Sequence, residues 1–135
     1  RRSYITAPPK LDLQDKRNPQ LDEKYSMLDK SILPLSECLK DTYNRLMPLW
    51  NSSIKPKIKS QKNVFIIAHG NSIRALIKNL DNISDEEIVG INIPTGIPLV
   101  YELNNRLEPI NHYYLGNKKD IIKKTLAVAH QGKSN

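Results

Sequence analysis

The stretch that most constrains the fold is a short apolar run followed by a histidine and a helical pattern. Residues 64–68 read Val-Phe-Ile-Ile-Ala, which predicts a β-strand buried on both faces, as in a parallel sheet. His69-Gly70-Asn71-Ser72 comes next. The apolar residues beyond it recur at the spacing of one helical face, at Ile73, Leu76, Ile77 and Leu80. We therefore expect a strand that leads directly into an amphipathic helix, with Arg74 and Lys78 on the opposite face.

A second helical pattern covers residues 37–60. Its apolar stripe predicts core packing, with Ser36 as the N-cap and Pro48 either as a kink or as the start of a second helix. The stripe consists of Leu39, Tyr43, Leu46, Met47, Trp50, Ile54 and Ile58.

The last third of the chain predicts a helix, two strands and a final helix. The capping-box spacing of Ser84 and Glu87 places a helix start at Asp85. Strands are expected over 97–103 and 106–114, joined by a tight turn at Asn104-Asn105. The final helix is expected over 118–129, and its inward residues would be Ile121, Ile122, Leu126 and Ala129.

This order of elements predicts an α/β fold, a three-layer sandwich with a mostly parallel sheet. Three strands make a thin sheet for so many helices, so we expect further strands upstream of residue 1. Residues 5–35 hold four prolines among many charges, and they are expected to form either a floppy surface loop or a lid. Residues 131–135 are expected to be a flexible tail.

The charge of the chain admits three interpretations. The net charge is +7, from 21 basic and 14 acidic residues, and fifteen of the basic residues are lysine. Nucleic-acid binding is one interpretation, although the lysines are dispersed and no recognition motif accompanies them. A coding bias and attraction of a small anionic substrate are the others. The single Cys38 excludes an internal disulfide, and no apolar run approaches the ~20 residues that span a bilayer.

Physical reasoning alone singles out His69 as a candidate site residue. It follows the predicted strand, where ligands bind in open α/β sheets. Gly70 would let the backbone turn and approach a ligand, and Asn71 stands at a helix N-terminus that favours anions. The alternative is a merely packed or capping histidine. His112 is interpreted as a strand residue and His130 as a helix-end surface residue.

Several short motifs together resemble one family. They are Arg1-Arg2-Ser3-Tyr4, Glu37-Cys38-Leu39-Lys40-Asp41-Thr42, Ala68-His69-Gly70-Asn71-Ser72, Pro94-Thr95-Gly96-Ile97-Pro98, Val100-Tyr101-Glu102-Leu103 and Gln131-Gly132-Lys133. In this order they resemble the 2,3-bisphosphoglycerate-dependent phosphoglycerate mutases of the histidine phosphatase superfamily. The resemblance runs over nearly all of residues 1–135, which would form the C-terminal part of a single such domain.

The resemblance implies a division of the active site between this chain and an upstream part. Members accept phosphate on the histidine of an Arg-His-Gly motif, which occurs nowhere in this sequence. Their acid/base glutamate also lies upstream of the Arg pair. His69 would then stabilise the transferred phosphoryl group, while Arg1, Arg2, Gly70 and Asn71 would bind substrate. The chain alone is expected to be inactive.

The resemblance also implies the reaction and its setting. The parent would be a cytoplasmic glycolytic and gluconeogenic isomerase and a homo-oligomer, interconverting 3-phosphoglycerate and 2-phosphoglycerate. It would work through a phosphohistidine and 2,3-bisphosphoglycerate, with no metal, nucleic acid or membrane partner. The alternatives are a bisphosphoglycerate phosphatase or synthase on the same scaffold, or a remnant without a nucleophile that binds anions or nucleic acid.

Overall fold

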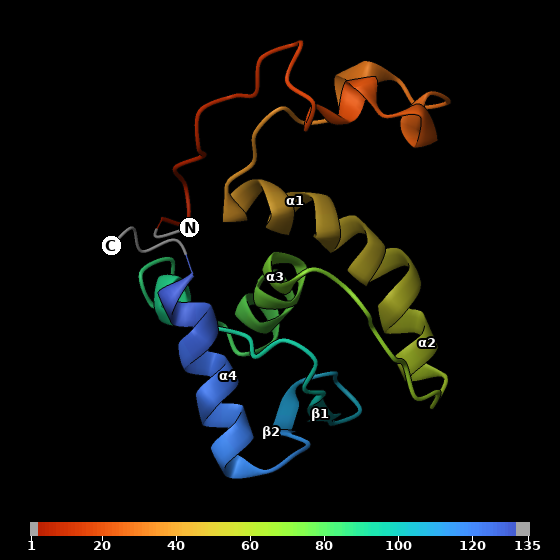
Figure 1. Cartoon of the computed structure of the whole chain (residues 1–135). Coiled ribbons are helices and arrows are strands. Elements are labelled where there is room, and N and C mark those ends of the chain that lie inside the picture. The colour runs from red at the N-terminus through yellow and green to blue at the C-terminus, as the bar shows by residue number, and fades with distance from the viewer. Residues whose placement is uncertain (1–2, 132–135) are drawn as a thin grey trace.

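The computed structural model describes residues 3–131 as a mixed α/β structure (Figure 1). Its α-helices are α1 (Leu39–Leu49), α2 (Lys55–Lys59), α3 (Gly70–Leu80) and α4 (Lys118–His130). The strands β1 (Leu99–Leu103) and β2 (Pro109–Tyr114) form a two-stranded antiparallel sheet. The predicted α/β class is confirmed, but the described residues contain no parallel strand pair.

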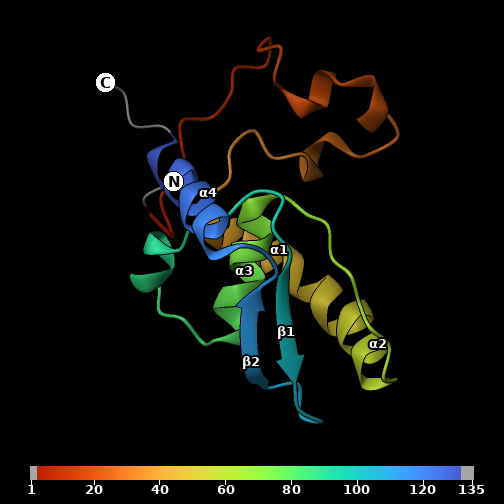
Figure 2. The ribbon, with the colours of Figure 1, turned by 60° about the horizontal axis from the view of Figure 1, so that its bottom comes forward.

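Helices α1 and α3 pack against each other and enclose the hydrophobic core (Figure 2). The buried members of this core are Tyr4, Leu39, Ala75 and Ile88. Tyr43, Leu46, Ile83 and Ile91 are partly buried around them. Because Leu39, Tyr43 and Leu46 belong to the predicted stripe, the interpretation of that stripe as core packing is confirmed for α1.

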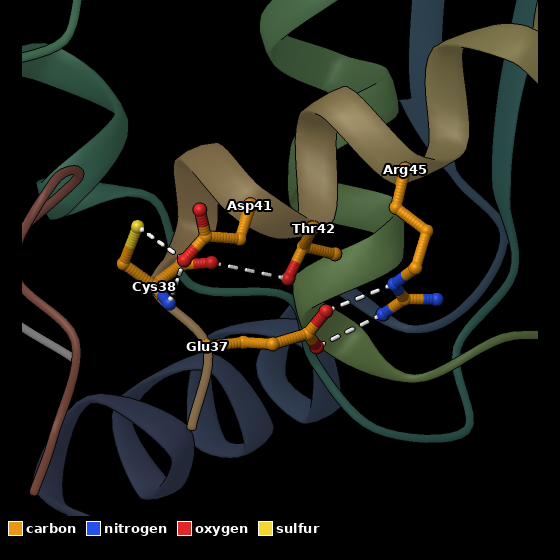
Figure 3. Close-up of polar contacts among 5 residues, drawn as sticks. All are labelled: Glu37, Cys38, Asp41, Thr42 and Arg45. Atoms are coloured by element: carbon orange, nitrogen blue, oxygen red, sulfur yellow. Dashed lines mark hydrogen bonds and ion pairs between the residues drawn. The ribbon is translucent and has the colours of Figure 1, made fainter. Parts of the chain in front are cut away.

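The N-terminus of α1 is closed by side chains from its own first turns (Figure 3). The Cys38 N–H donates to Asp41 Oδ2 at 2.9 Å, and the Cys38 Sγ lies 3.0 Å from the same oxygen. These hydrogen bonds from Cys38 hold the pKa of Asp41 below its usual range. One turn further, Arg45 donates two hydrogen bonds to the Glu37 carboxylate, each at 2.9 Å. The single cysteine is thus the N-cap residue of a helix.

The expected Ser36 cap and the expected start of a second helix at Pro48 are wrong, and a kink at Pro48 stays a prediction. Ser36 is not the cap, because its hydroxyl instead donates to the backbone carbonyl of Pro8. Pro48 lies inside α1, and the helical path continues beyond it through one π-helical turn, Trp50–Ile54, into α2. The Lys55 N–H bonds to the carbonyl of Trp50, five residues earlier, which is the hydrogen bond of the widened π-helical turn.

The predicted strand at residues 64–68 does not form. The segment between α2 and α3 is extended but joins no sheet. Phe65 and Ile67 are 80% and 86% exposed, so the expectation of burial on both faces is wrong. An apolar run acquires strand structure only when neighbouring strands supply hydrogen-bond partners, and β1 and β2 pair elsewhere.

The hairpin follows the predicted strands with a longer connection. Leu99 pairs with Tyr114 and Tyr101 with His112, which confirms His112 as a strand residue. The connection is not a two-residue turn. The Asn104 side-chain oxygen accepts the N–H groups of residues 106 and 108, at 2.9 and 3.0 Å, and Leu107 has φ 63°. Asn104 therefore organises the whole loop.

A polar contact fastens the hairpin to the end of α3. The Tyr101 hydroxyl donates to Asp81 Oδ2 at 2.7 Å, and Asp81 is the C-cap of that helix. Burial and the bond to Asp81 raise the pKa of Tyr101 far above its usual value. We expect Tyr101→Phe to lower the free energy of unfolding by about 1 kcal/mol at neutral pH, since a half-buried bond to a charged group is lost.

The same contact predicts how stability depends on alkaline pH. A raised pKa in the folded state favours folding below the unfolded pKa of about 10, and this contribution is lost as the pH rises further. Urea unfolding at about pH 8 and about pH 11 should therefore show a larger loss for the wild type than for Tyr101→Phe. Equal losses of stability in both proteins would contradict the assignment of this pH dependence to Tyr101. Tyr113→Phe, at an exposed tyrosine, is the control and should behave like the wild type.

Two other predicted helices are only partly correct. Ser84 and Glu87 do form the reciprocal capping bonds, each 3.1 Å, but only a 3-10 turn follows, Glu87–Gly90. Helix α4 forms as predicted and ends at the exposed His130. Of its expected inward residues, Ile122 and Leu126 are about half exposed, at 50% and 52%. Helix α4 therefore has no fully buried face.

Residues 5–35 form an irregular arm that projects from the helices (Figure 1). It contains only short 3-10 turns, at Pro19–Leu21, Glu23–Tyr25 and Lys30–Ile32. The arm is closed at its base by the Leu11 N–H, which donates to the Leu35 carbonyl at 3.1 Å. The irregular character is confirmed, and a lid role stays a prediction. The tail at 132–135 lies outside the described residues, and within them no helix has the length and apolar character to cross a membrane.

Candidate functional site

His69 stands immediately before α3 and caps it. Its Nδ1 accepts the backbone N–H of Asn71 at 3.2 Å, and its carbonyl accepts the N–H of Ile73 at 3.1 Å. When Nδ1 of a neutral imidazole accepts a hydrogen bond, the ring proton is on Nε2. The side chain is exposed, so this Nε2–H faces outward as a hydrogen-bond donor. Capping and ligand binding are therefore compatible in His69, which the sequence left as alternatives.

The backbone around His69 offers further donors. The N–H groups of Gly70 and Ser72 lie in the first turn of α3, and neither finds an acceptor within the described part of the chain. Helix α3 has 11 residues, so its dipole places partial positive charge at this end. The free N–H groups at this helix start are those of Gly70 and Ser72, because the Asn71 N–H is already bonded to His69 Nδ1. Anion binding at His69, Gly70 and Asn71 stays a prediction.

Gly70 is not required by the backbone. It is the first residue of α3, its φ is not in the left-handed region, and an added Cβ would meet nothing within 4 Å. The chain enters α3 at Gly70 without the left-handed backbone that would require glycine. What remains is open space beside its N–H, which suits close approach of a ligand.

Arg74 is the residue of this region that sequence reasoning misplaced. It was expected on the solvent face of α3, but it is only 6% exposed. Its guanidinium donates to the Ile88 carbonyl at 2.6 Å and to the Asn71 side-chain oxygen at 3.3 Å. It therefore brings a buried positive charge to the first turn of the helix. The helical periodicity could not reveal this, because the partner carbonyl lies in a separate 3-10 turn.

Lys78 is also drawn inward, against the expectation for its face. Its ammonium contacts Asp85 Oδ1 and the Ile83 carbonyl, both at 2.7 Å, and lies 4.7 Å from the centre of the Tyr4 ring. Tyr4 in turn accepts the Lys40 N–H through its carbonyl. This anchors the residues after Arg1 and Arg2 beside α1 and α3. Arg1 and Arg2 themselves lie outside the described residues.

A small pocket lies at the opposite end of α3. It has a volume of about 250 Å³, and four aliphatic side chains and Tyr114 line it together with Asp81, Tyr101 and His112. His112 Nδ1 lies 3.6 Å from Asp81 Oδ2, and its ring centre lies 4.9 Å from that of Tyr101. Ile77, the α3 residue of this lining nearest to His69, lies eight residues further along the chain, a rise of about 12 Å along the helix. It is therefore no part of the His69 site.

Within residues 3–131, no group of histidine, cysteine and acidic side chains is arranged to hold a metal ion. The groups that the structure describes at His69 are hydrogen-bond donors and the positive end of a helix dipole. No model of a known protein family matches the chain.

Proposed function

We propose that this chain is the C-terminal part of a 2,3-bisphosphoglycerate-dependent phosphoglycerate mutase, and that it supplies the anion-stabilising side of the active site. The proposal rests on the ordered motifs of the sequence and on one structural observation. That observation is the capping His69, whose Nε2–H projects outward beside the free N–H groups of the α3 start.

This arrangement suits phosphoryl transfer. The charge of a transferring phosphoryl group is spread over three oxygens, and donors fixed in advance stabilise it without reorganisation. His69 Nε2–H and the N–H groups of Gly70 and Ser72 would donate to these oxygens, and Arg1 and Arg2 would hold the substrate's other anionic groups. The nucleophilic histidine and the acid/base glutamate would come from the upstream part.

In the proposed reaction the phosphohistidine gives its phosphoryl group to 3-phosphoglycerate and forms 2,3-bisphosphoglycerate. The intermediate reorients and returns its other phosphoryl group to the histidine, which leaves 2-phosphoglycerate. Splitting the transfer into two covalent steps lowers each barrier. Without its nucleophile this chain alone should show no turnover of 3-phosphoglycerate.

The unpaired segment at 64–68 supports the same proposal. In the complete protein it would become an interior strand of the mostly parallel sheet, flanked by upstream strands. The exposure of Phe65 and Ile67 is consistent with such absent neighbours. Pairing would place His69 at the carboxyl end of a fixed strand.

The chain as it stands permits a direct test of the anion site. Titration of the ¹⁵N-labelled chain with inorganic phosphate should shift the amide signals of Gly70, Asn71 and Ser72, with a Kd on the order of 1 mM, or about −4 kcal/mol. The affinity should fall as salt rises. The variant His69→Ala should weaken it, whereas His130→Ala, which removes another exposed histidine, should not. Shifts spread evenly over the lysines would count against the site.

A further inference from the structure

Arg74 connects the first turn of α3 to the interior of the molecule. Its side chain is 6% exposed, and its guanidinium donates to the Ile88 carbonyl at 2.6 Å and to Asn71 Oδ1 at 3.3 Å. Residues three apart are neighbours on a helix, and helical side chains lean toward the N-terminus. Arg74 therefore reaches back to the helix start, where Asn71 lies.

The bond from Arg74 fixes which way round the Asn71 amide lies. A guanidinium can only donate hydrogen bonds, so the amide has to present its oxygen to Arg74. Its nitrogen is then the other branch, and within residues 3–131 this Nδ2 donates to no acceptor. Because Asn71 is an exposed residue, its two side-chain N–H groups are open to a ligand.

Asn71 is also tied to His69 through its backbone. The Asn71 N–H donates to His69 Nδ1 at 3.2 Å, which leaves Nε2 of the imidazole as the donor. The His69 Nε2–H, the backbone N–H groups of Gly70 and Ser72, and the Asn71 side-chain amide would then all donate. Such a set suits a ligand group that only accepts hydrogen bonds, as a fully ionised phosphoryl group does.

Packing alone does not account for an arginine at position 74. Burial of a charge costs free energy, and a cation near the start of a helix lies toward the positive end of the helix dipole. An apolar side chain of similar length, such as methionine, would fill the space without either cost. What arginine adds is its positive charge and a rigid pair of donors, one for Ile88 and one for Asn71.

We propose that Arg74 is a positioning residue of the anion site, which holds the Asn71 side-chain oxygen and so turns the N–H groups of that amide toward a bound phosphoryl group. Arg74 itself does not touch the ligand and acts through Asn71. The inference rests on the proposed function, because it takes the anion site at His69 as its premise.

The first test follows the Asn71 side chain in the wild-type chain. Titration of the ¹⁵N-labelled chain with inorganic phosphate should shift the Asn71 Nδ2 signals together with the backbone amides of Gly70 and Ser72. The side-chain signals of Asn105, an exposed asparagine in the hairpin connection, should not move. Backbone shifts without a shift of the Asn71 side chain would overturn the positioning role and leave the anion site intact. Absence of all these shifts would overturn both proposals.

A double-mutant cycle tests whether Arg74 acts through Asn71. Asn71→Ala removes the amide and should weaken phosphate binding by about tenfold, since a hydrogen bond to a charged group is lost. Arg74→Met should weaken it by about the same factor, and the double variant should bind no more weakly than either single variant. Losses that multiply in the double variant, or an unchanged Kd in either single variant, would contradict the proposal.

Arg74→Lys separates orientation from charge. Lysine keeps the positive charge but lacks the planar fork of donors, so this variant should bind phosphate as weakly as Arg74→Met does. Wild-type affinity in Arg74→Lys would mean that the charge alone matters, and the positioning role would be wrong.

Asn71→Asp supplies a test that leaves the buried arginine in place. The aspartate keeps an oxygen for Arg74 and puts a second carboxylate oxygen where the amide nitrogen stood. It should therefore abolish phosphate binding without lowering the thermal midpoint. Asn105→Asp adds the same charge in the hairpin connection and should leave both quantities unchanged. Phosphate binding that survives in Asn71→Asp would show that this branch of the side chain does not face the anion, and would overturn the proposal.

Discussion

Under the proposed function, His69→Ala is expected to reduce mutase turnover by about 10²–10³-fold in a protein that includes the proposed upstream part. The substitution removes the outward Nε2–H and the Nδ1 that accepts the Asn71 N–H. Both losses weaken the donors that would face phosphoryl oxygens. Steady-state rates with 3-phosphoglycerate, measured with 2,3-bisphosphoglycerate present, provide the test.

Loss of the cap must be separated from loss of chemistry. His69→Asn keeps a side-chain oxygen that can accept the Asn71 N–H, since asparagine is among the preferred N-cap residues. It should therefore restore the thermal midpoint without restoring turnover. Turnover that rises and falls with the thermal midpoint in both variants would contradict the role assigned to His69 in stabilising the phosphoryl group. Unchanged turnover in His69→Ala would contradict it as well.

Ile88→Ala is expected to lower the free energy of unfolding by about 3 kcal/mol. Ile88 is fully buried between α1, α3 and Tyr4, so the substitution removes apolar burial and leaves a cavity. Its carbonyl also accepts the bond from Arg74, so disorder of this turn would release the buried guanidinium. Urea denaturation of the chain measures the change.

Ile110→Ala is the matched control for that experiment. It deletes the same atoms from a side chain that is 68% exposed, and it should cost less than about 1 kcal/mol. A similar loss in both variants would mean that the cluster around Ile88 is not the stabilising core. A loss well below about 3 kcal/mol in Ile88→Ala would indicate that the 3-10 turn around residue 88 relaxes into the cavity.

The local patterns of this sequence located α1, α3 and both strands of the hairpin, but they were wrong about residues 64–68. The stripes in α1 and α3 repeat every three or four residues, so each helix could be located from its own residues. Whether the strand predicted at 64–68 forms could not be judged in this way, and it does not form. A strand requires hydrogen-bond partners from elsewhere in the chain. The composition of Val-Phe-Ile-Ile-Ala indicates only a high propensity for strand structure and not whether such partners exist.

The candidate site shows the same limit. His69 was singled out because it follows a predicted strand and precedes a helix; the helix forms and His69 caps it, whereas the strand does not form and its role in binding stays a prediction. Arg74 could not be placed in this way, because its burial depends on the carbonyl of Ile88, fourteen residues later in an irregular turn. Cys38 was interpreted only as excluding a disulfide and as part of a resemblance motif, whereas Asp41 three residues later is the capping signal that could have located the helix start.

The closed base of the irregular arm has a consequence for how the protein can vary. Leu11 and Leu35 meet through a backbone hydrogen bond, so the two ends of the intervening segment are held together by the arm itself. Lengthening or shortening the segment changes the closure entropy only slowly, by roughly 0.6 kcal/mol for each doubling of its length. The arm can therefore diverge in length and sequence, or be cut by a protease at its tip, while the paired helices keep their arrangement. The pairing of Leu11 with Leu35, rather than the sequence of the whole arm, is therefore what limits how the arm can change during evolution.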